Sequence, residues 1–416
     1  MLTVEAALAR ILETVESTAI ERVALEESVG RVMAEEVASP IHVPPWDNSA
    51  MDGYAVIAAD TRVGEVSLVV NETVPAGCTG SKYVTAGTAT AVMTGAPIPA
   101  GADAVVIVEN TNGFREDTVM VRGEAKPGQN IRAKGQDIFQ GTSVLARGAT
   151  CTPANVGLLA SLGMTHVKVR RRPTVAILST GDELVRGGQP LKPGQIYSSN
   201  NVALAGMVRE AGGIPRDMGI APDTPSELQA FLEGCLECDI VLTTGGVSAG
   251  KYDHVKESWA ALGAEMDFWK VRMKPGKPLA FGRVERNGKT VVLFGLPGNP
   301  VSCLVNFLQF TRPWIRSALG CEKPFLPVIK VRAGEVFTQR AGREQLMRVT
   351  LTRSDGEWVC WSTGSQSSGV LRSMATADAL LMIDRDTEAV NVGDLVWVQL
   401  IRPAALHEAQ PRYRWS

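Results

Sequence analysis

A regular alternation of strand and helix patterns between residues 172 and 322 is the feature that most limits the fold. Buried-strand runs such as TVAILST (174–180) and DIVLTTGG (239–246) alternate with helical runs such as NNVALAGMVREAG (200–212). Strand–helix–strand order is typical of a doubly wound α/β domain and predicts a parallel sheet. Asn287-Gly288, which separates two further β-runs, predicts a hairpin near the end of the same segment.

The sequence before this segment predicts a helical part interrupted by a β module. Helical spacing of apolar residues occurs at 3–15, at 24–37 and at 152–163, where Thr152 is a suitable N-cap and Pro153 suits the first helical position. We therefore assign a discontinuous helical and linker part to 1–40 and 142–171. Short β-runs separated by Pro, Gly and Asn clusters indicate an inserted β module at 41–141.

Five β-runs follow the α/β segment and predict a C-terminal β domain at 323–416. The fold class is therefore α/β plus β, in several domains. A chain of 416 residues is long enough for this division.

Composition excludes some partners. The 42 basic and 44 acidic side chains are interspersed and give a net charge of -2, so no overall field attracts nucleic acid or anionic lipid. No apolar run reaches the roughly 18 residues of a membrane span. The seven cysteines are scattered, as in a protein with reduced thiols, and the first residues form an acidic amphipathic pattern, so we expect a cytoplasmic protein.

Ligands of an open parallel sheet bind at the carboxyl ends of its strands. Three strand patterns end there in glycine-bearing turns, any one of which could simply close a strand-to-helix connection. The candidate binding residues in these turns are Thr180, Gly181, Asp182, Glu183, Gly245, Gly246, Ser248, Pro297, Gly298, Asn299 and Pro300.

The third turn and a lysine pair together suggest an oxyanion site. Asn299 suits an N-cap and Pro300 a first helical position, which predicts unpaired N–H groups at the start of a helix. A helix end contributes only about 0.3 to 1 kcal/mol towards one charge. Lys274 and Lys277, in MKPGKP, are the natural supplement if their proline-rich loop lies on the same edge. A solvated turn is the alternative for this pair.

Four carboxylates accompany these turns, namely Asp182, Glu183, Asp223 and Asp253. Acids beside a phosphate site indicate Mg²⁺, which binds oxygen ligands and bridges substrate phosphates. Asp223 and Asp253 could instead begin a turn or cap a helix. The constellation therefore predicts a phosphate ester handled with a metal.

A set of ordered motifs resembles one family over essentially the whole chain. In order, they are DNSAMDGYAV (47–56), MTGAPIP (93–99), GQNIRAKGQDI (128–138), STGDEL (179–184), TTGGVSAGKYD (243–253), KPGKPLAFG (274–282) and GLPGNPVS (295–302). Together they resemble the molybdopterin molybdenumtransferases, which include bacterial MoeA proteins and the gephyrin E domain.

The resemblance implies an elongated, four-part subunit that forms a homodimer. It implies insertion of molybdate into adenylylated molybdopterin with Mg²⁺, and release of AMP and finished molybdenum cofactor. The active cleft would lie between the α/β domain of one subunit and the inserted β module of the other. Contact with the upstream adenylyltransferase and with acceptor molybdoenzymes is a further expectation.

Matching motifs also assign roles to residues. The implied catalytic residues are Asp52, Asp137, Glu183, Asp223, Asp253, Lys274 and Lys277. The implied cofactor-binding residues are Thr94, Arg132 and Ser368, together with the turn residues Thr180, Gly181, Asp182, Gly245, Gly246, Ser248, Pro297, Gly298, Asn299 and Pro300. The implied metal ligands are Asp182, Glu183, Asp223 and Asp253.

Three positions depart from the family pattern: Gln136 and Lys251 stand where an acid is common, and Ser367 stands where a glycine is usual. Two alternatives to the transferase remain. An adenylyltransferase acting one step earlier uses a related α/β domain but usually lacks the flanking β domains. A non-catalytic scaffold would be expected to have lost acids or lysines that this chain retains.

Overall fold

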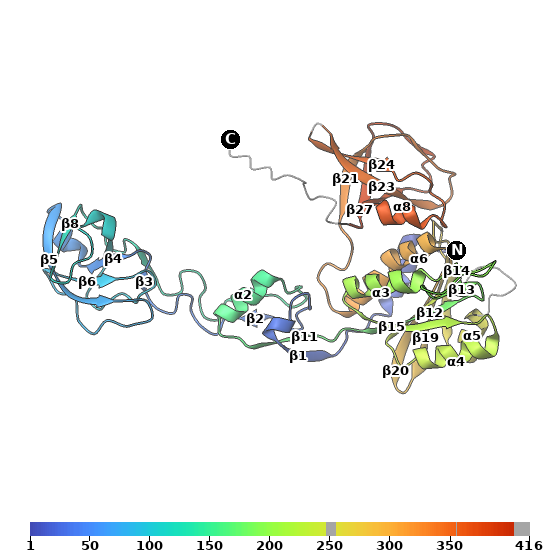
Figure 1. The fold of residues 1–416 in the computed structure, drawn as a ribbon, viewed down its shortest axis with the longest axis horizontal. Coiled ribbons are helices and arrows are strands. Elements are labelled where there is room, and N and C mark those ends of the chain that lie inside the picture. The colour runs from blue at the N-terminus through green and yellow to red at the C-terminus, as the bar shows by residue number, and fades with distance from the viewer. Residues whose placement is uncertain (247–254, 355, 403–416) are drawn as a thin grey trace.

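The structure is a computed structural model that describes residues 1–246, 255–354 and 356–402. It is elongated (Figure 1): the β module lies at one end of an arm, and the α/β domain and the C-terminal β domain lie at the other. The linker part lies between them. No helix among the described residues has the length and apolar character needed to cross a bilayer.

The central sheet of the α/β domain has six strands in the order β15-β12-β16-β20-β19-β17. Their bounds are Ile214–Ala221, Thr174–Thr180, Ile240–Thr244, Lys289–Leu296, Pro278–Arg286 and Glu265–Lys270. The first four run parallel, but β19 and β17 are antiparallel to their neighbours, so the prediction of a parallel sheet is only partly right. The cause is the predicted hairpin at Asn287 and Gly288, where φ is 53° and 72°, because such a tight turn can join only antiparallel strands.

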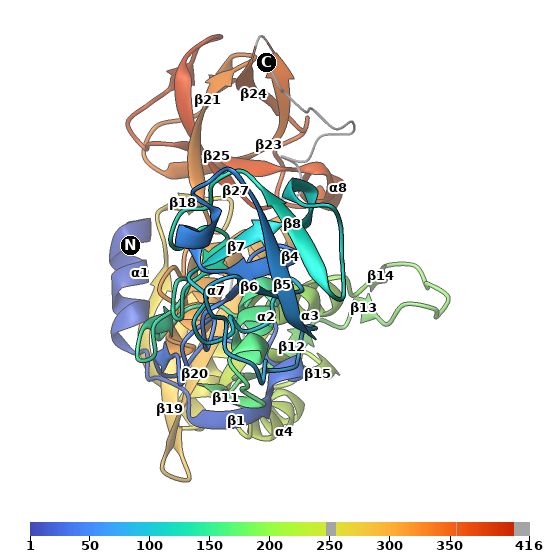
Figure 2. The same ribbon diagram turned by 90° about the vertical axis from the view of Figure 1, so that its left-hand side faces the viewer.

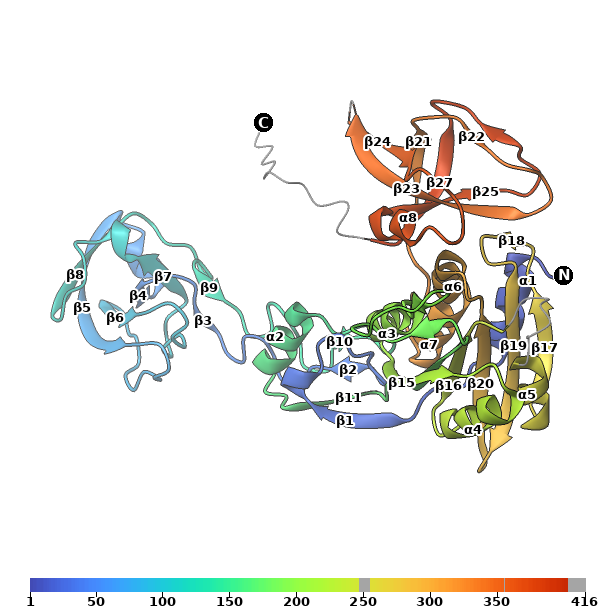
Figure 3. The ribbon, with the colours of Figure 1, turned by 45° about the vertical axis from the view of Figure 1, so that its right-hand side comes forward.

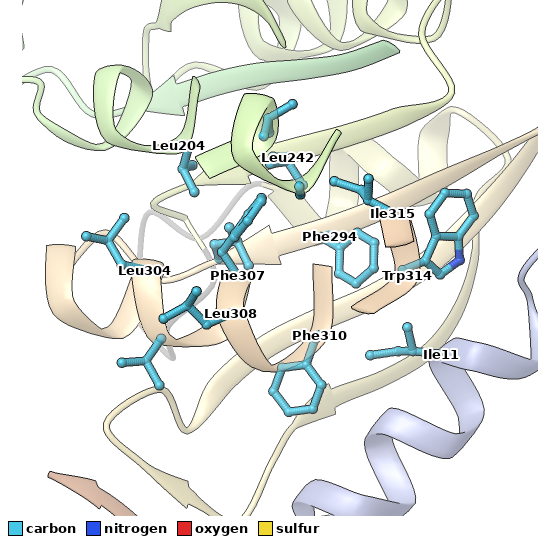
Figure 4. Close-up of a cluster of buried hydrophobic side chains, with 14 of the residues drawn as sticks. Ile11, Leu204, Leu242, Phe294, Leu304, Phe307, Leu308, Phe310, Trp314 and Ile315 are labelled. Carbon is cyan, nitrogen blue, oxygen red and sulfur yellow. The ribbon is translucent and has the colours of Figure 1, made fainter. Parts of the chain in front are cut away.

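Helices cover both faces of this sheet. One core contains Val175 and Ile177 of β12 with side chains of α3 (Asn200–Ala211), α6 (Pro300–Asn306), α7 (Arg312–Ala318) and α1 (Val4–Glu13) (Figure 4). The other contains Ala176 and Leu178 with side chains of α4 (Pro225–Cys235) and α5 (Val255–Ala261). Successive residues of a strand point to opposite faces, which explains why β12 is apolar without interruption.

A π-helical turn (Phe307–Thr311) separates α6 from α7, where the sequence predicts one continuous helix. Pro313 follows this turn at the start of α7 and has no N–H to donate to the carbonyl one turn earlier. The wider turn keeps Phe307, Phe310 and Ile315 buried in the core.

The linker part corrects one prediction, since residues 24–37 do not form a helix. They follow β1 (Ile20–Ala24), make a 3₁₀ turn (Leu25–Glu27) and end at β2 (Val37–Ala38). Gly30, with φ of 77°, breaks the helical path. Leu25, Met33 and Val37 are nevertheless buried together. The spacing of the apolar residues therefore reflects packing of a bent chain and not a helix.

The remaining linker elements complete two small ribbons. β1 pairs with β11 (His166–Arg170), and β2 pairs with β10 (Ser143–Leu145). α2 (Pro153–Ser161) begins as predicted, because the Thr152 side chain accepts from the N–H of Asn155 and the Asn155 side chain accepts from the N–H of Thr152.

The β module contains a five-stranded sheet in the order β7-β4-β6-β5-β8 (Figure 2). These strands span Ala104–Ile107, Gly53–Val56, Thr88–Val92, Glu65–Val74 and Thr118–Arg122, and β3 (Asn48–Ser49) pairs with β9 (Ile131–Arg132) beside them. Tyr54, Leu68 and Val119 are among the residues of its own core.

The C-terminal strands form a closed barrel (Figure 3), since the order β23-β24-β21-β27-β25 ends with a pairing of β25 to β23. These strands span Glu344–Ser354, Glu357–Ser362, Val328–Ala333, Leu395–Leu400 and Ala379–Ile383. Two short strands, β22 (Phe337–Thr338) and β26 (Ala389–Val390), pair with each other, and α8 (Leu371–Thr376) lies next to the α/β domain. β18 (Met273–Lys274), which belongs in sequence to the α/β domain, pairs with β23.

A buried carboxylate joins the arm to the α/β domain. Asp239, at the start of β16, accepts from Arg171 at 2.8 Å and from Lys289 at 2.9 Å, and the Thr174 N–H and hydroxyl donate to it as well. Burial opposes ionisation here, but the hydrogen bonds from Arg171, Lys289 and Thr174 hold the pKa of the Asp239 carboxyl well below its usual range.

Replacing Asp239 with Asn is expected to lower the free energy of unfolding by about 2 kcal/mol at pH 7, because a neutral amide cannot pair with two cations. The folded-state pKa lies below the unfolded one, so this stabilisation is present above the unfolded pKa and is lost as pH falls through the folded pKa. The difference between variant and wild type should therefore narrow below about pH 4. Urea unfolding at stepped pH measures it.

The matched control is Asp267→Asn. The Asp267 carboxylate pairs with Arg10 at the surface, so this substitution should lower the free energy of unfolding by well under about 1 kcal/mol. If the Asp239→Asn variant and wild type differ as much in free energy of unfolding at pH 3 as at pH 7, the stabilising role of the ionised Asp239 is wrong.

Candidate active site

A cavity of about 660 Å³ lies at the carboxyl ends of β12, β16 and β20. Most of the turn residues expected from the sequence line it, which places the three glycine-bearing turns together. The lining residues among those predicted are Thr180, Gly181, Glu183, Asp223, Gly245, Gly246, Pro297, Gly298, Asn299 and Pro300. Ser248 and Asp253 lie outside the described residues.

Polar side chains that the sequence reasoning missed also line this cavity. Asn200, at the start of α3, donates from its Nδ2 to the Gly298 carbonyl at 2.9 Å and so ties α3 to the third turn. Three buried atoms, Thr180 Oγ1, Ser198 Oγ and Asn200 Oδ1, have no hydrogen-bond partner among the described residues. A buried polar atom without a partner is costly, so these atoms indicate a polar ligand. The cluster SSNN (198–201), which leads into the first turn of α3, was the available signal in the sequence.

A second cavity, of about 490 Å³, contains the lysine pair. It shares Pro278, Asn299 and Ser302 with the first cavity, so the two are adjacent. The rest of its lining comes from the lysine loop and from the C-terminal part: Met273, Lys274, Pro275, Gly276, Lys277, Arg343, Gln366, Ser367 and Ser368. Among the described residues it gathers three cationic side chains and no carboxylate. Arg343 was not predicted, because nothing near it in sequence marks it.

Backbone pairing explains where the lysines lie. Met273 and Lys274 pair with Glu344 and Gln345 of the barrel, while the antiparallel β19 begins at Pro278, beside the carboxyl end of β20. Gly276 has a φ of 101°, and a Cβ there would come within 2.9 Å of Asn306 Oδ1. A glycine between the lysines is therefore required by the backbone and by the contact with α6.

A serine loop, residues 364–369, forms the barrel side of both cavities. Arg348, which is only 1% exposed, donates to the carbonyls of Ser365 and Ser367 at 3.3 and 3.1 Å. Burial lowers the pKa of Arg348 to about 10, so it is still charged at neutral pH. This contact, unforeseen from the sequence, holds Ser367 and Ser368 against the lysine loop.

The serine loop also corrects the expectation of free N–H groups at the start of α6. The Val301 N–H donates to the Ser368 carbonyl at 3.1 Å. Asn299 occupies the N-cap position, but its side chain makes no capping hydrogen bond. The cationic side chains, rather than the helix end, therefore dominate the electrostatics of the second cavity.

The predicted acids of the α/β domain separate into two groups. Glu183 and Asp223 line the first cavity, whereas Asp182 is exposed outside its lining and accepts from the Asp223 N–H at 3.2 Å. Thr224, not Asp223, is the N-cap position of α4. The described residues contain no group of three or more His, Cys, Asp or Glu side chains placed to hold a metal. Two carboxylates are nevertheless a suitable donor set for Mg²⁺, which commonly uses one or two together with substrate phosphates.

The β module, which carries the remaining predicted residues, lies at the opposite end of the arm from the α/β domain within one chain (Figure 1). Asp52 accepts from the Thr94 N–H and hydroxyl at 2.7 and 2.8 Å, and the backbone and then the hydroxyl hydrogen bond lower the pKa of Asp52. Arg132 on β9 and Asp137 are exposed, and the Asp137 N–H donates to Val43. A single chain therefore does not join these residues to the lysine pair.

Comparisons with known proteins agree over most of the chain. Three family models match: the MoeA N-terminal region (domain I and II) at 2–163, the probable molybdopterin binding domain at 176–317 and the MoeA C-terminal region (domain IV) at 330–401. Molybdopterin molybdenumtransferase 2 of Mycobacterium tuberculosis is 41% identical over 89% of this chain and 92% of its own. The chain belongs to the molybdopterin molybdenumtransferase family. It is thus an enzyme of molybdenum cofactor biosynthesis.

Other relatives support the same assignment. The molybdopterin molybdenumtransferase of Haemophilus influenzae is 36% identical over 96% of this chain and 98% of its own. The crystal structure of the molybdopterin biosynthesis MoeA protein from Pyrococcus horikosii has a TM-score of 0.82 and 34% identity, and covers 96% of this chain and 99% of its own. The multidomain fold expected from the sequence is therefore confirmed.

Two departures from the family pattern can be placed. Gln136 is exposed, and its Oε1 accepts from the Ala133 N–H at 3.1 Å, so it stabilises its own turn. Ser367 lines the second cavity beside Ser368. Lys251 lies outside the described residues.

Replacing Arg348 with Met is expected to loosen the serine loop, because the carbonyls of Ser365 and Ser367 lose their donor. We expect a loss of about 1 to 3 kcal/mol in unfolding free energy and faster amide exchange across 364–370. Hydrogen exchange followed by mass spectrometry measures the second effect. Arg385→Met, at a partly exposed position after β25, is the matched control, and equal exchange in the two variants would refute the role of Arg348.

Proposed function

We propose that this transferase inserts molybdate into adenylylated molybdopterin and releases AMP together with finished molybdenum cofactor, in a Mg²⁺-dependent reaction. The observation that carries the proposal is the contact between two unlike cavities. One is polar, glycine-lined and bears Glu183 and Asp223; the other gathers Lys274, Lys277 and Arg343. A substrate that carries phosphates and must meet a small metal oxyanion matches such a pair.

The cationic cavity suits molybdate, a tetrahedral dianion. Lys274, Lys277 and Arg343 repel one another in a shared space, and a dianion between them relieves that repulsion. The Ser368 hydroxyl adds a neutral donor on the same wall. We therefore assign molybdate binding to this cavity, close to the dithiolene end of the substrate.

The polar cavity suits the adenylylated pterin. Gly245, Gly246 and Gly298 allow the substrate phosphates to approach the backbone closely. Glu183 and Asp223 would hold Mg²⁺, which when bound supplies positive charge to the pyrophosphate linkage. Cleavage of that phosphoanhydride with water yields AMP and the phosphomonoester of the pterin. Lysine side chains of the adjacent cationic cavity stabilise the negative charge that develops on the departing phosphate.

We further propose that the enzyme is a homodimer in which the β module of one subunit completes the cleft of the other. The support is that the β module, which carries Asp52 and Arg132, and the α/β domain lie at opposite ends of the arm within one chain (Figure 1). Exposed, oriented groups such as the Asp52–Thr94 pair then face substrate rather than solvent. The same proposal includes domain boundaries at 41, 142, 172 and 323. It also includes a cytoplasmic location, and contacts with the preceding adenylyltransferase and with acceptor molybdoenzymes.

Reconstitution tests the reaction directly. Purified protein is mixed with adenylylated molybdopterin, Mg²⁺ and molybdate, and AMP release and activation of an apo-molybdoenzyme are followed. Lys274→Ala and Lys277→Ala should each lower the rate at least about a hundredfold, as expected for loss of a positioned charge, while their thermal unfolding stays as in wild type. Lys323→Ala, at an exposed position away from both cavities, is the control.

Near-wild-type activity in both lysine variants would overturn the assignment of the cationic cavity. Formation of adenylylated molybdopterin from ATP, with release of pyrophosphate, would instead favour the adenylyltransferase. Binding of substrate without turnover in any combination would favour the non-catalytic scaffold.

Co-expression of two inactive variants tests the shared cleft. Asp52→Asn and Lys274→Ala alter opposite sides, so a mixed dimer has one doubly altered site and one intact site if the cleft lies between subunits. Random pairing of equal amounts then restores about a quarter of wild-type activity. Each variant alone should stay inactive. No recovery in a mixture shown by mass spectrometry to contain mixed dimers would mean that the subunits do not share a cleft.

A further inference from the structure

An excursion of the chain, residues 184–197, forms one rim of the polar cavity. It leaves through β13 (Leu184–Val185) and returns through β14 (Ile196–Tyr197), which pair in parallel. The Ile196 N–H donates to the Glu183 carbonyl at 2.8 Å, and the Ser198 N–H to the Val185 carbonyl at 2.9 Å. The excursion projects from the side of the α/β domain (Figure 2). The two hydrogen bonds anchor both ends of this ribbon beside the cavity.

The rim presents apolar side chains to a cavity that also contains buried polar atoms. Leu184, Ile196 and Tyr197 line it, yet Ile196 is 55% and Tyr197 47% exposed. The Tyr197 ring is held in place, since its hydroxyl donates to the Gln189 carbonyl at 2.8 Å. A fixed, half-exposed aromatic ring beside a ligand cavity is well suited to stack on a flat ligand group.

The same cavity contains hydrogen-bonding side-chain atoms without partners among the described residues. Thr180 is 5% and Asn200 8% exposed, and Thr180 Oγ1 and Asn200 Oδ1 have no partner among the described residues. The Asn200 amide nitrogen is already bound to Gly298, so its oxygen is fixed as an acceptor. An N–H on the edge of a ligand ring would satisfy it.

We propose that a planar nitrogen heterocycle of the substrate stacks on Tyr197, with its N–H edge held by Asn200. This inference rests on the proposed function, whose substrate contains two such rings, the pterin and the adenine of the adenylyl group. Both share the flat face and the polar edge that the cavity recognises. Tyr197 is thereby a binding residue for the ring, distinct from the cations that bind the oxyanion.

Calorimetric titration with AMP and with ribose 5-phosphate isolates the ring contribution, because the two probes share a phosphate and a ribose. Tyr197→Ala should weaken AMP binding about tenfold or more, as for other base–aromatic stacks, and leave ribose 5-phosphate unchanged. Tyr197→Phe keeps the ring and should bind AMP within about threefold of wild type. Leu191→Ala, on the same excursion but outside the cavity lining, is the matched control.

The same series with 6-hydroxymethylpterin phosphate distinguishes the two sources of the ring. A loss confined to AMP assigns the adenine, a loss confined to the pterin probe assigns the pterin, and a loss for both means that either ring occupies the platform. The inference is overturned if the Tyr197→Ala variant binds AMP and 6-hydroxymethylpterin phosphate as tightly as wild type does. It is also overturned if the variant loses as much affinity for ribose 5-phosphate as for these two probes. These titrations need no turnover, so they stand even if AMP release in the reconstituted reaction fails.

Discussion

The backbone pairing of β18 with β23 is the contact on which the rest of the site depends. It joins Met273 and Lys274 to the barrel strand that follows Arg343, and so brings cationic side chains from two domains into one cavity. Hydrogen bonds between backbones fix register as well as distance, which side-chain contacts alone would not do. The serine loop, held by Arg348 and bonded to Val301, closes the same junction from the other side.

This junction also explains the division of charge. Carboxylates occur on turns that end parallel strands, whereas the lysines occur where an antiparallel strand begins at the same edge. The mixed sheet therefore places carboxylates and cationic side chains in two adjacent cavities. The cationic cavity suits an anion, and the cavity that contains the carboxylates suits a cation beside it.

Local signals in the sequence predicted much of this architecture. Thr152 and Pro153 marked a helix start, Asn287-Gly288 marked a hairpin, and glycine turns marked the cavity edge, because each depends only on neighbouring residues. The residues that were missed depend on distant contacts. Arg343 and Arg348 are five positions apart in sequence, yet one lines a cavity and the other is buried under the serine loop. Apolar residues within 24–37 have helical spacing, but tertiary packing and the positive φ of Gly30 produce a bent chain instead of a helix.

The elongated shape gives a physical reason for the proposed dimer. The β module has its own core and is joined to the linker part by two chain segments, so its position relative to the cavities is set largely by the arm. At the other end of that arm, the Asp239 cluster fixes Arg171 to the central sheet. An arm anchored in this way presents Asp52 and Arg132 at a defined distance from its own cavities, where they cannot act on the same substrate. A twofold-related partner is the simplest arrangement that brings them to a cavity, because each arm then serves the site that the other chain leaves open.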